Sequence, residues 1–183
     1  MSKSGLLIGI DGRDRRVVAN QSKLLAEHLR SKGYNVTLID FGDLSAITSR
    51  YIERYESGEY ESDSLYEPYS PAVFYALNHF EHKQDITKAL NAGDVVICSR
   101  YVITTILDAL HKAPFIEGLA GWIETLEYDM YSMPKPDISF ALAESEKEYA
   151  MSLDTVCRTP IRVIDLETHD RSITAIEDQI YSH

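Results

Sequence analysis

The stretch Leu6-Leu7-Ile8-Gly9-Ile10-Asp11-Gly12 lies near the beginning of this chain. Its apolar residues form a run of the length expected for a buried β-strand, and the glycines that end it are typical of a tight turn. The segment from Ser22 to Ser31 then has the apolar spacing of a helix. The chain is therefore predicted to begin with a strand, a glycine turn and a helix.

A strand, a glycine turn and a helix in this order form the layout of a phosphate-binding loop, or P-loop. In a P-loop, backbone N–H groups and the helix N-terminus cradle phosphates, a Lys reaches the transferred phosphate, and a Ser or Thr holds Mg²⁺. Here the turn continues through residues 13–20 without a Gly-Lys-Ser/Thr sequence. We predict a phosphate loop made of Gly9, Asp11, Gly12, Arg13, Arg15 and Arg16. Its candidate catalytic residues are Asp11, Arg15 and Arg16, of which either arginine could replace the charge of the Lys.

Further short apolar runs predict four more strands, at residues 35–39, 95–98, 138–142 and 161–164. Between and after them, amphipathic stretches predict helices at about 44–55, 71–91, 104–111, 115–131 and 173–181, and the polar segment 56–64 predicts a surface loop. This alternation predicts an α/β fold of three layers, in which helices cover both faces of a parallel sheet of about five strands. Ligands of such folds bind at the carboxyl ends of the strands. A length of 183 residues fits a single domain spanning 1–183.

Composition argues against several classes of protein. The net charge is −11 and no basic stripe is visible, which argues against nucleic-acid binding. No apolar run approaches the roughly 18 residues of a membrane span. Cys98 and Cys157 lack metal-ligand spacing, so we expect no metal site, and they fit a cytoplasmic location. The arginines at 13, 15 and 16 form the only dense basic cluster, which is either a solvated turn or an anion site.

Six elements in order resemble the thymidylate kinase family over nearly the whole chain. They are the loop from Gly9 to Gly12, the helix after it, Phe41-Gly42-Asp43, Tyr75-Ala76-Leu77-Asn78-His79-Phe80-Glu81, Ser99-Arg100-Tyr101 and Pro134-Lys135-Pro136-Asp137. The resemblance implies the architecture of P-loop NTP hydrolases and kinases, and a homodimer. It also implies a nucleoside site, for which the candidates are Phe41, Tyr75, His79, Arg100 and Tyr101.

The family resemblance assigns roles to some of these positions, and a simpler structural role competes with each. Tyr75 stands where the family stacks an aromatic ring on thymine, although its helical apolar spacing somewhat favours core packing. Arg100 stands where the family contacts phosphate or base, and a charge at the end of a buried strand needs an anionic partner. Asp11 and Asp43 follow strands, where a kinase would have carboxylates near the metal or the reacting hydroxyl. Capping of a helix or formation of a turn explains either residue equally well. Trp122 is expected in the core or at a dimer surface.

The sequence departs from the family pattern at the positions that serve phosphoryl transfer in the family. The loop lacks its Lys and its Ser/Thr and is read as about three residues too long. His79 replaces an Arg of the family, and Ser99 replaces the Asp of its Asp-Arg-Tyr. Only a short segment between 143 and 160 remains where the family has a helix, an arginine-bearing lid and another helix, so a deleted lid is expected.

Three functions are compatible with this pattern. The first is a thymidylate kinase-like protein that keeps a nucleotide or phosphate pocket, with ATP:dTMP phosphotransferase activity weak or lost. The second is an active nucleoside monophosphate kinase with an Arg-containing phosphate loop, and only this function needs ATP and Mg²⁺ as cofactors. The third is a non-catalytic homodimer with a regulatory or scaffolding role. The expected ligand of the first is a dTMP-like nucleotide or phosphate.

Overall fold

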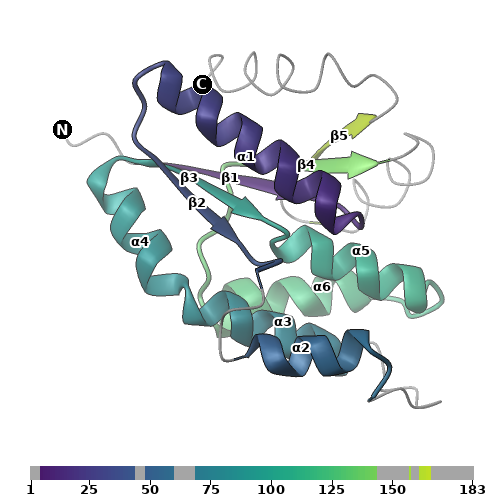
Figure 1. The fold of residues 1–183 in the computed structure, drawn as a ribbon. Coiled ribbons are helices and arrows are strands. Elements are labelled where there is room, and N and C mark those ends of the chain that lie inside the picture. The colour runs from purple at the N-terminus through teal and green to yellow at the C-terminus, as the bar shows by residue number, and fades with distance from the viewer. Residues whose placement is uncertain (1–4, 44–47, 60–68, 144–156, 158–160, 166–183) are drawn as a thin grey trace.

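The computed structural model describes residues 5–43, 48–59, 69–143, 157 and 161–165. Five parallel strands form one sheet in the order β2-β3-β1-β4-β5 (Figure 1). The strands are β1 (Leu6–Asp11), β2 (Val36–Asp40), β3 (Val95–Ser99), β4 (Ile138–Ala143) and β5 (Ile161–Asp165). The predicted fold class and the five predicted strands are confirmed.

Helices cover both faces of the sheet, as the buried strands require. The helices are α1 (Arg15–Ser31), α2 (Ser49–Glu56), α3 (Tyr69–Glu81), α4 (Lys83–Ala92), α5 (Val102–Lys112) and α6 (Leu119–Glu124), which continues as the π-helix η1 (Thr125–Met130). On one face, α1 packs against alternate residues of β1, including Ile8 and Ile10. On the other face, Leu7 and Cys98 lie in a larger core with α5 and α6. The carboxyl ends of β1 and β3 point at the N-terminal ends of α1 and α5 (Figure 1).

Three predicted helices differ from the observed ones. The helix predicted at 71–91 is two helices that meet at His82, because α3 packs on α5 whereas α4 packs on β3. The helix predicted at 115–131 begins only after Gly118, whose φ of 78° ends the preceding turn. The first helix begins at Arg15, seven residues before the predicted start.

Some predictions concern residues outside the described part of the chain. These are the final helix at 173–181, most of the loop at 56–64 and nearly all of the segment at 143–160 where a lid deletion is expected. Within the described part, no helix is both long and apolar enough to cross a membrane.

Candidate functional site

The turn between β1 and α1 satisfies its own backbone donors with side-chain oxygens. Asp14 is the N-cap of α1, and its Oδ1 accepts hydrogen bonds from the N–H groups of Arg16 at 2.9 Å and Val17 at 3.0 Å. The N–H of Gly12 donates to Thr104 Oγ1 at 3.2 Å. A P-loop directs such N–H groups at phosphate. In this chain, carboxylate and hydroxyl oxygens occupy the same donors.

Counting from Gly9 shows which residues replace the P-loop chemistry. The P-loop pattern has four residues between its two glycines, followed by Lys and Ser or Thr. On that spacing Asp14, Arg15 and Arg16 stand at the positions of the second Gly, the Lys and the Ser/Thr. The loop therefore has the ordinary length, and the prediction of about three extra residues is wrong. The polar residues of the first turn of α1 hid its helical periodicity.

The residues at this turn do not fit Mg²⁺ in the way a P-loop holds it. The position of the metal-binding hydroxyl is taken by Arg16, whose guanidinium donates hydrogen bonds and accepts none. In the described ranges, moreover, no group of three or more His, Cys, Asp or Glu side chains could hold a metal ion. The absence of a dedicated metal site stays a prediction.

Asp11 joins the end of β1 to the first turn of α5. Its Oδ1 accepts from the N–H of Thr104 at 3.0 Å and from Thr104 Oγ1 at 2.8 Å. The side chain is fully buried, and this burial raises its pKa from 3.8 to about 6 even though the Thr104 hydrogen bonds act in the opposite direction. Asp11 therefore has the structural role of capping a helix. Gly9 lies behind it in β1, where a Cβ would come within 2.7 Å of Ser139 Oγ.

A cavity of about 420 Å³ opens beside the phosphate loop. Its volume is in the range of small-molecule sites. Four permanent cations and one carboxylate are among the side chains that line it, so the cavity is electropositive in a chain of strongly negative net charge. The lining residues are Arg13, Arg15, Tyr55, Pro71, Ala72, Tyr75, Arg100, Thr105, Asp108, Ala109, His111 and Lys112.

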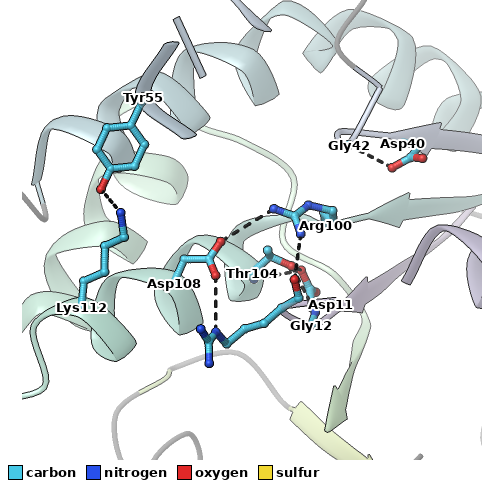
Figure 2. Close-up of polar contacts among 10 residues, drawn as sticks. Asp11, Gly12, Asp40, Gly42, Tyr55, Arg100, Thr104, Asp108 and Lys112 are labelled. Atoms are coloured by element: carbon cyan, nitrogen blue, oxygen red, sulfur yellow. Dashed lines mark hydrogen bonds and ion pairs between the residues drawn. The ribbon is translucent and has the colours of Figure 1, made fainter. Parts of the chain in front are cut away.

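Asp108 lies beside Arg100 in the lining of the cavity (Figure 2). Its carboxylate lies 3.7 Å from Arg100 Nη2 and 3.9 Å from Arg13 Nε. Arg100 is only 7% exposed, has a left-handed φ of 60°, and donates from Nη1 to the carbonyl of Arg13 at 3.4 Å. The anionic partner expected for Arg100 is thus a carboxylate of the same chain. Asp108 is not among the site residues predicted from the sequence. It lies on the same face of α5 as Thr104 and Thr105, and this helical spacing could have indicated it.

A second polar pair lies at the other end of the cavity. Lys112 Nζ donates to the hydroxyl of Tyr55 at 2.6 Å and lies 4.2 Å from the centroid of the same ring. Lys112 is in the last turn of α5 and Tyr55 is near the end of α2. Figure 2 shows the two side chains pointing toward one another, away from the cluster around Arg100.

The predicted nucleoside-site residues separate into two groups. Tyr75 and Arg100 line the cavity. Phe41, His79 and Tyr101 are not among its lining residues and lie instead in the core, at most 4% exposed. The ring of Phe41 stacks on Tyr101 at 5.5 Å and meets the edge of His79 at 4.5 Å.

Hydrogen bonds hold the two polar members of this core cluster in place. His79 Nδ1 lies 2.7 Å from Glu127 Oε1, and the Tyr101 hydroxyl donates to the carbonyl of Pro134 at 3.0 Å. Burial raises the pKa of the Tyr101 phenol well above its usual value. The side chains of Phe41, His79 and Tyr101 therefore pack on one another outside the cavity lining, and their contact with a nucleoside stays a prediction. A sequence motif identifies residues on a helix, but it does not show which of them face the core and which face the cavity.

Two further candidates have structural roles. Asp43 is exposed, and its N–H donates to the carbonyl of Asp40 in a turn after β2. Trp122 is 38% exposed and meets the ring of Tyr69 at 4.8 Å, edge to face, so it lies at the surface.

Comparison with known proteins identifies the family. The family model for thymidylate kinase matches residues 10–152. The chain belongs to the thymidylate kinase family. It is 32% identical over 149 residues to a probable thymidylate kinase of Pyrococcus horikoshii, a match that covers 79% of this chain and 67% of the relative. It is also 29% identical over 177 residues to the thymidylate kinase of Plasmodium falciparum, covering 91% of this chain and 78% of that one.

Solved thymidylate kinases have the same fold. The structure from Candida albicans superposes with a TM-score of 0.70 at 24% identity, over 100% of this chain and 93% of the other. The structure from Ehrlichia chaffeensis gives a TM-score of 0.68 at 21% identity, over 98% and 99% of the two chains. The P-loop kinase architecture implied by the sequence motifs is thereby confirmed.

Proposed function

We propose that this member of the thymidylate kinase family binds a dTMP-like nucleotide while its ATP:dTMP phosphotransferase activity is weak or lost. The observation that carries the proposal is the carboxylate of Asp14 on the first N–H groups of α1. A phosphoryl donor needs these N–H groups for its own phosphates, and a carboxylate there repels a phosphate as well as occupying its donors.

The missing groups strengthen this argument. Phosphoryl transfer is catalysed almost entirely by positioning and charge stabilisation. Removal of one stabilising donor typically lowers a rate by about 10²–10³. Here Arg15 and Arg16 replace both the Lys and the Ser/Thr of the P-loop. Two contributions to the stabilisation of the transition state are therefore altered at once. A guanidinium is a planar fork and reproduces neither a compact ammonium nor a hydroxyl.

The cavity supports nucleotide binding independently of catalysis. Arg13, Arg15 and Arg100 line the cavity together with one carboxylate, Asp108, and this excess of positive charge attracts a phosphate. Arginine binds phosphate in the same forked geometry as carboxylate. Tyr75, Pro71 and Ala72 provide apolar walls for a base.

Thermal unfolding with dTMP tests the binding. A ligand at one hundred times its dissociation constant stabilises the native state by about 2.7 kcal/mol, which raises Tm by roughly 5–10 °C for a chain of this size. We expect that rise for the native chain, its loss in Arg100→Met, and its retention in Arg30→Met. Arg30 is an exposed arginine at the far end of α1 and is the matched control. No change in Tm with saturating dTMP would contradict the proposal.

One observation favours the alternative of an active kinase. Arg15 begins α1 at the position of the P-loop Lys and lines the cavity, so it is placed to contact a transferred phosphate. A coupled assay with ATP and dTMP on the native chain and on the triple variant Asp14→Gly, Arg15→Lys, Arg16→Ser separates the two functions. We expect a large gain of turnover in the triple variant. Equal and substantial turnover in both proteins would favour the active kinase.

We further propose that the chain forms a homodimer in the cytoplasm. Large apolar side chains are exposed on α3 and η1, namely Leu77 at 37%, Phe80 at 47% and Met130 at 70%. Light scattering on the native chain and on Phe80→Glu tests the dimer, which the added charge should weaken. The buried thiol of Cys98 is in keeping with a reducing compartment.

A further inference from the structure

The end of the cavity farthest from the phosphate loop consists of hydrogen-bond donors. The ammonium of Lys112 has three N–H groups, and one of them is held by the Tyr55 hydroxyl at 2.6 Å. Because the hydroxyl accepts that bond, its own proton remains available to a second acceptor. Within the described residues, the Lys112 ammonium has no carboxylate partner, and its hydrogen bond and its ring contact are both with Tyr55. This end of the cavity is therefore suited to a ligand group that accepts hydrogen bonds.

The distance between the two ends of the cavity suits a nucleoside monophosphate. Along α5, the lining residues run from Thr105 to Lys112, a rise of about 10 Å at 1.5 Å per residue. The arginine pair with Arg100 lies at the first end, and Lys112 with Tyr55 lies at the second (Figure 2). A ligand whose phosphate lies at Arg100 would thus place the far edge of its base near Lys112.

We propose that Lys112, positioned by Tyr55, is the residue that sets base specificity in this site. It donates a hydrogen bond to the keto oxygen at position 4 of a thymine or uracil ring. This inference rests on the proposed function, because it requires the phosphate of a nucleotide at the arginine end. Lys112 contacts the ligand directly, whereas Tyr55 is a positioning residue that fixes the direction of the ammonium.

The same arrangement rejects cytosine. Cytosine carries an amino group at position 4, which would set N–H groups against the ammonium and leave a positive charge without an acceptor. Lys112 is exposed, so water can hydrate the ammonium when the ligand offers no acceptor. The expected discrimination is therefore that of one charge-assisted hydrogen bond gained with thymine or uracil and absent with cytosine. The three nucleotides dTMP, dUMP and dCMP have the same phosphate charge, so their comparison isolates the edge of the base.

Isothermal titration of the full chain with dTMP, dUMP and dCMP tests the inference. For the native chain we expect dTMP and dUMP to bind at least tenfold more tightly than dCMP. In Lys112→Met the affinity for dTMP and dUMP should fall about tenfold while that for dCMP changes little, so the preference disappears. Lys88→Met removes the same charge from an exposed site on α4 outside the cavity lining and should keep the preference. Tyr55→Phe keeps the ring without the hydroxyl and should reduce the preference in part.

Three results would overturn the assignment. They are a native chain that binds dCMP as tightly as dTMP, an unchanged preference in Lys112→Met, and an equal loss for all three nucleotides in that variant. The last would mean that Lys112 contacts the anion and not the base. Binding without base preference refutes this inference alone, whereas no binding of any nucleotide refutes the proposed function and the inference with it.

Discussion

Replacing Asp14 by Asn changes the charge at the phosphate loop with little change in structure. The amide oxygen of Asn can still accept the hydrogen bonds from Arg16 and Val17, and Asn is as good an N-cap as Asp. We therefore expect the free energy of unfolding to change by less than about 1 kcal/mol, which is the charge–dipole contribution at a helix N-terminus. The anion affinity of the loop should change much more.

The expected gain in affinity follows from Coulomb's law. Two unit charges 4 Å apart in water repel each other by about 1 kcal/mol, and Asp14 is exposed, so the value for water applies. A phosphate group that carries up to two charges would then gain about 1–2 kcal/mol when the carboxylate is removed, or roughly five- to thirtyfold in dissociation constant. Asp14→Ala should show the same gain in affinity and cost about 1 kcal/mol of stability, because the capping oxygen is lost.

Titration with tripolyphosphate and with ATP at low ionic strength measures the affinity, and urea unfolding measures the stability. Asp85→Asn is the matched control, because Asp85 is an exposed carboxylate in the first turn of another helix, α4. If Asp14→Asn and Asp14→Ala bind both anions no more tightly than the native chain, Asp14 does not obstruct the loop. The explanation for lost phosphoryl transfer would then fail at its main step.

Three further predictions concern the arginines, the buried carboxylate and the core histidine. Arg15→Ala should weaken salt-sensitive phosphate binding, whereas Arg16→Ala should leave it nearly unchanged, because only Arg15 lines the cavity; equal effects in salt-dependent titrations would contradict this. Because the folded pKa of Asp11 is about 6 against 3.8 in the reference state, its contribution to stability is fully present below about pH 3.8 and is lost as the pH rises through about 6. Asp11→Asn should remove that slope and raise stability at pH 8 by up to about 3 kcal/mol, and unfolding curves with the native slope would refute the assignment. His79→Ala should destabilise the fold by about 3 kcal/mol, because it leaves the buried carboxyl of Glu127 unpaired, without changing the dTMP affinity of the folded protein. A large loss of affinity in calorimetry would instead place His79 in the ligand site.

The strands of this fold could be predicted from the sequence almost to the residue. Runs such as Val95–Ser99 are buried on both faces, so their apolar character is continuous and independent of context. Helix boundaries were less predictable. The start of α1 depends on Asp14 as a capping residue among arginines, and the break at His82 depends on which elements α3 and α4 pack against. Neither is encoded in local periodicity.

Within the candidate site, the sequence could predict only those residues that belong to a family motif and also face the cavity. Arg100 and Tyr75 fulfil that condition. Helical spacing from Thr104 could indicate Asp108 as a site residue, but not its ion pair with Arg13, which is distant in the sequence. The pair of Lys112 with Tyr55 joins residues 57 positions apart, so no local pattern indicates it. Their partners are chosen by the packing of α2 and the phosphate loop against α5.

Turnover measured together with binding tests the central claim most directly. The native chain is titrated with dTMP by calorimetry, and the same preparation is assayed with ATP, Mg²⁺ and saturating dTMP. Our account predicts a measurable dissociation constant for dTMP with product formation close to the uncatalysed background. Turnover of about 1 s⁻¹ or faster, as in ordinary kinases, would contradict it.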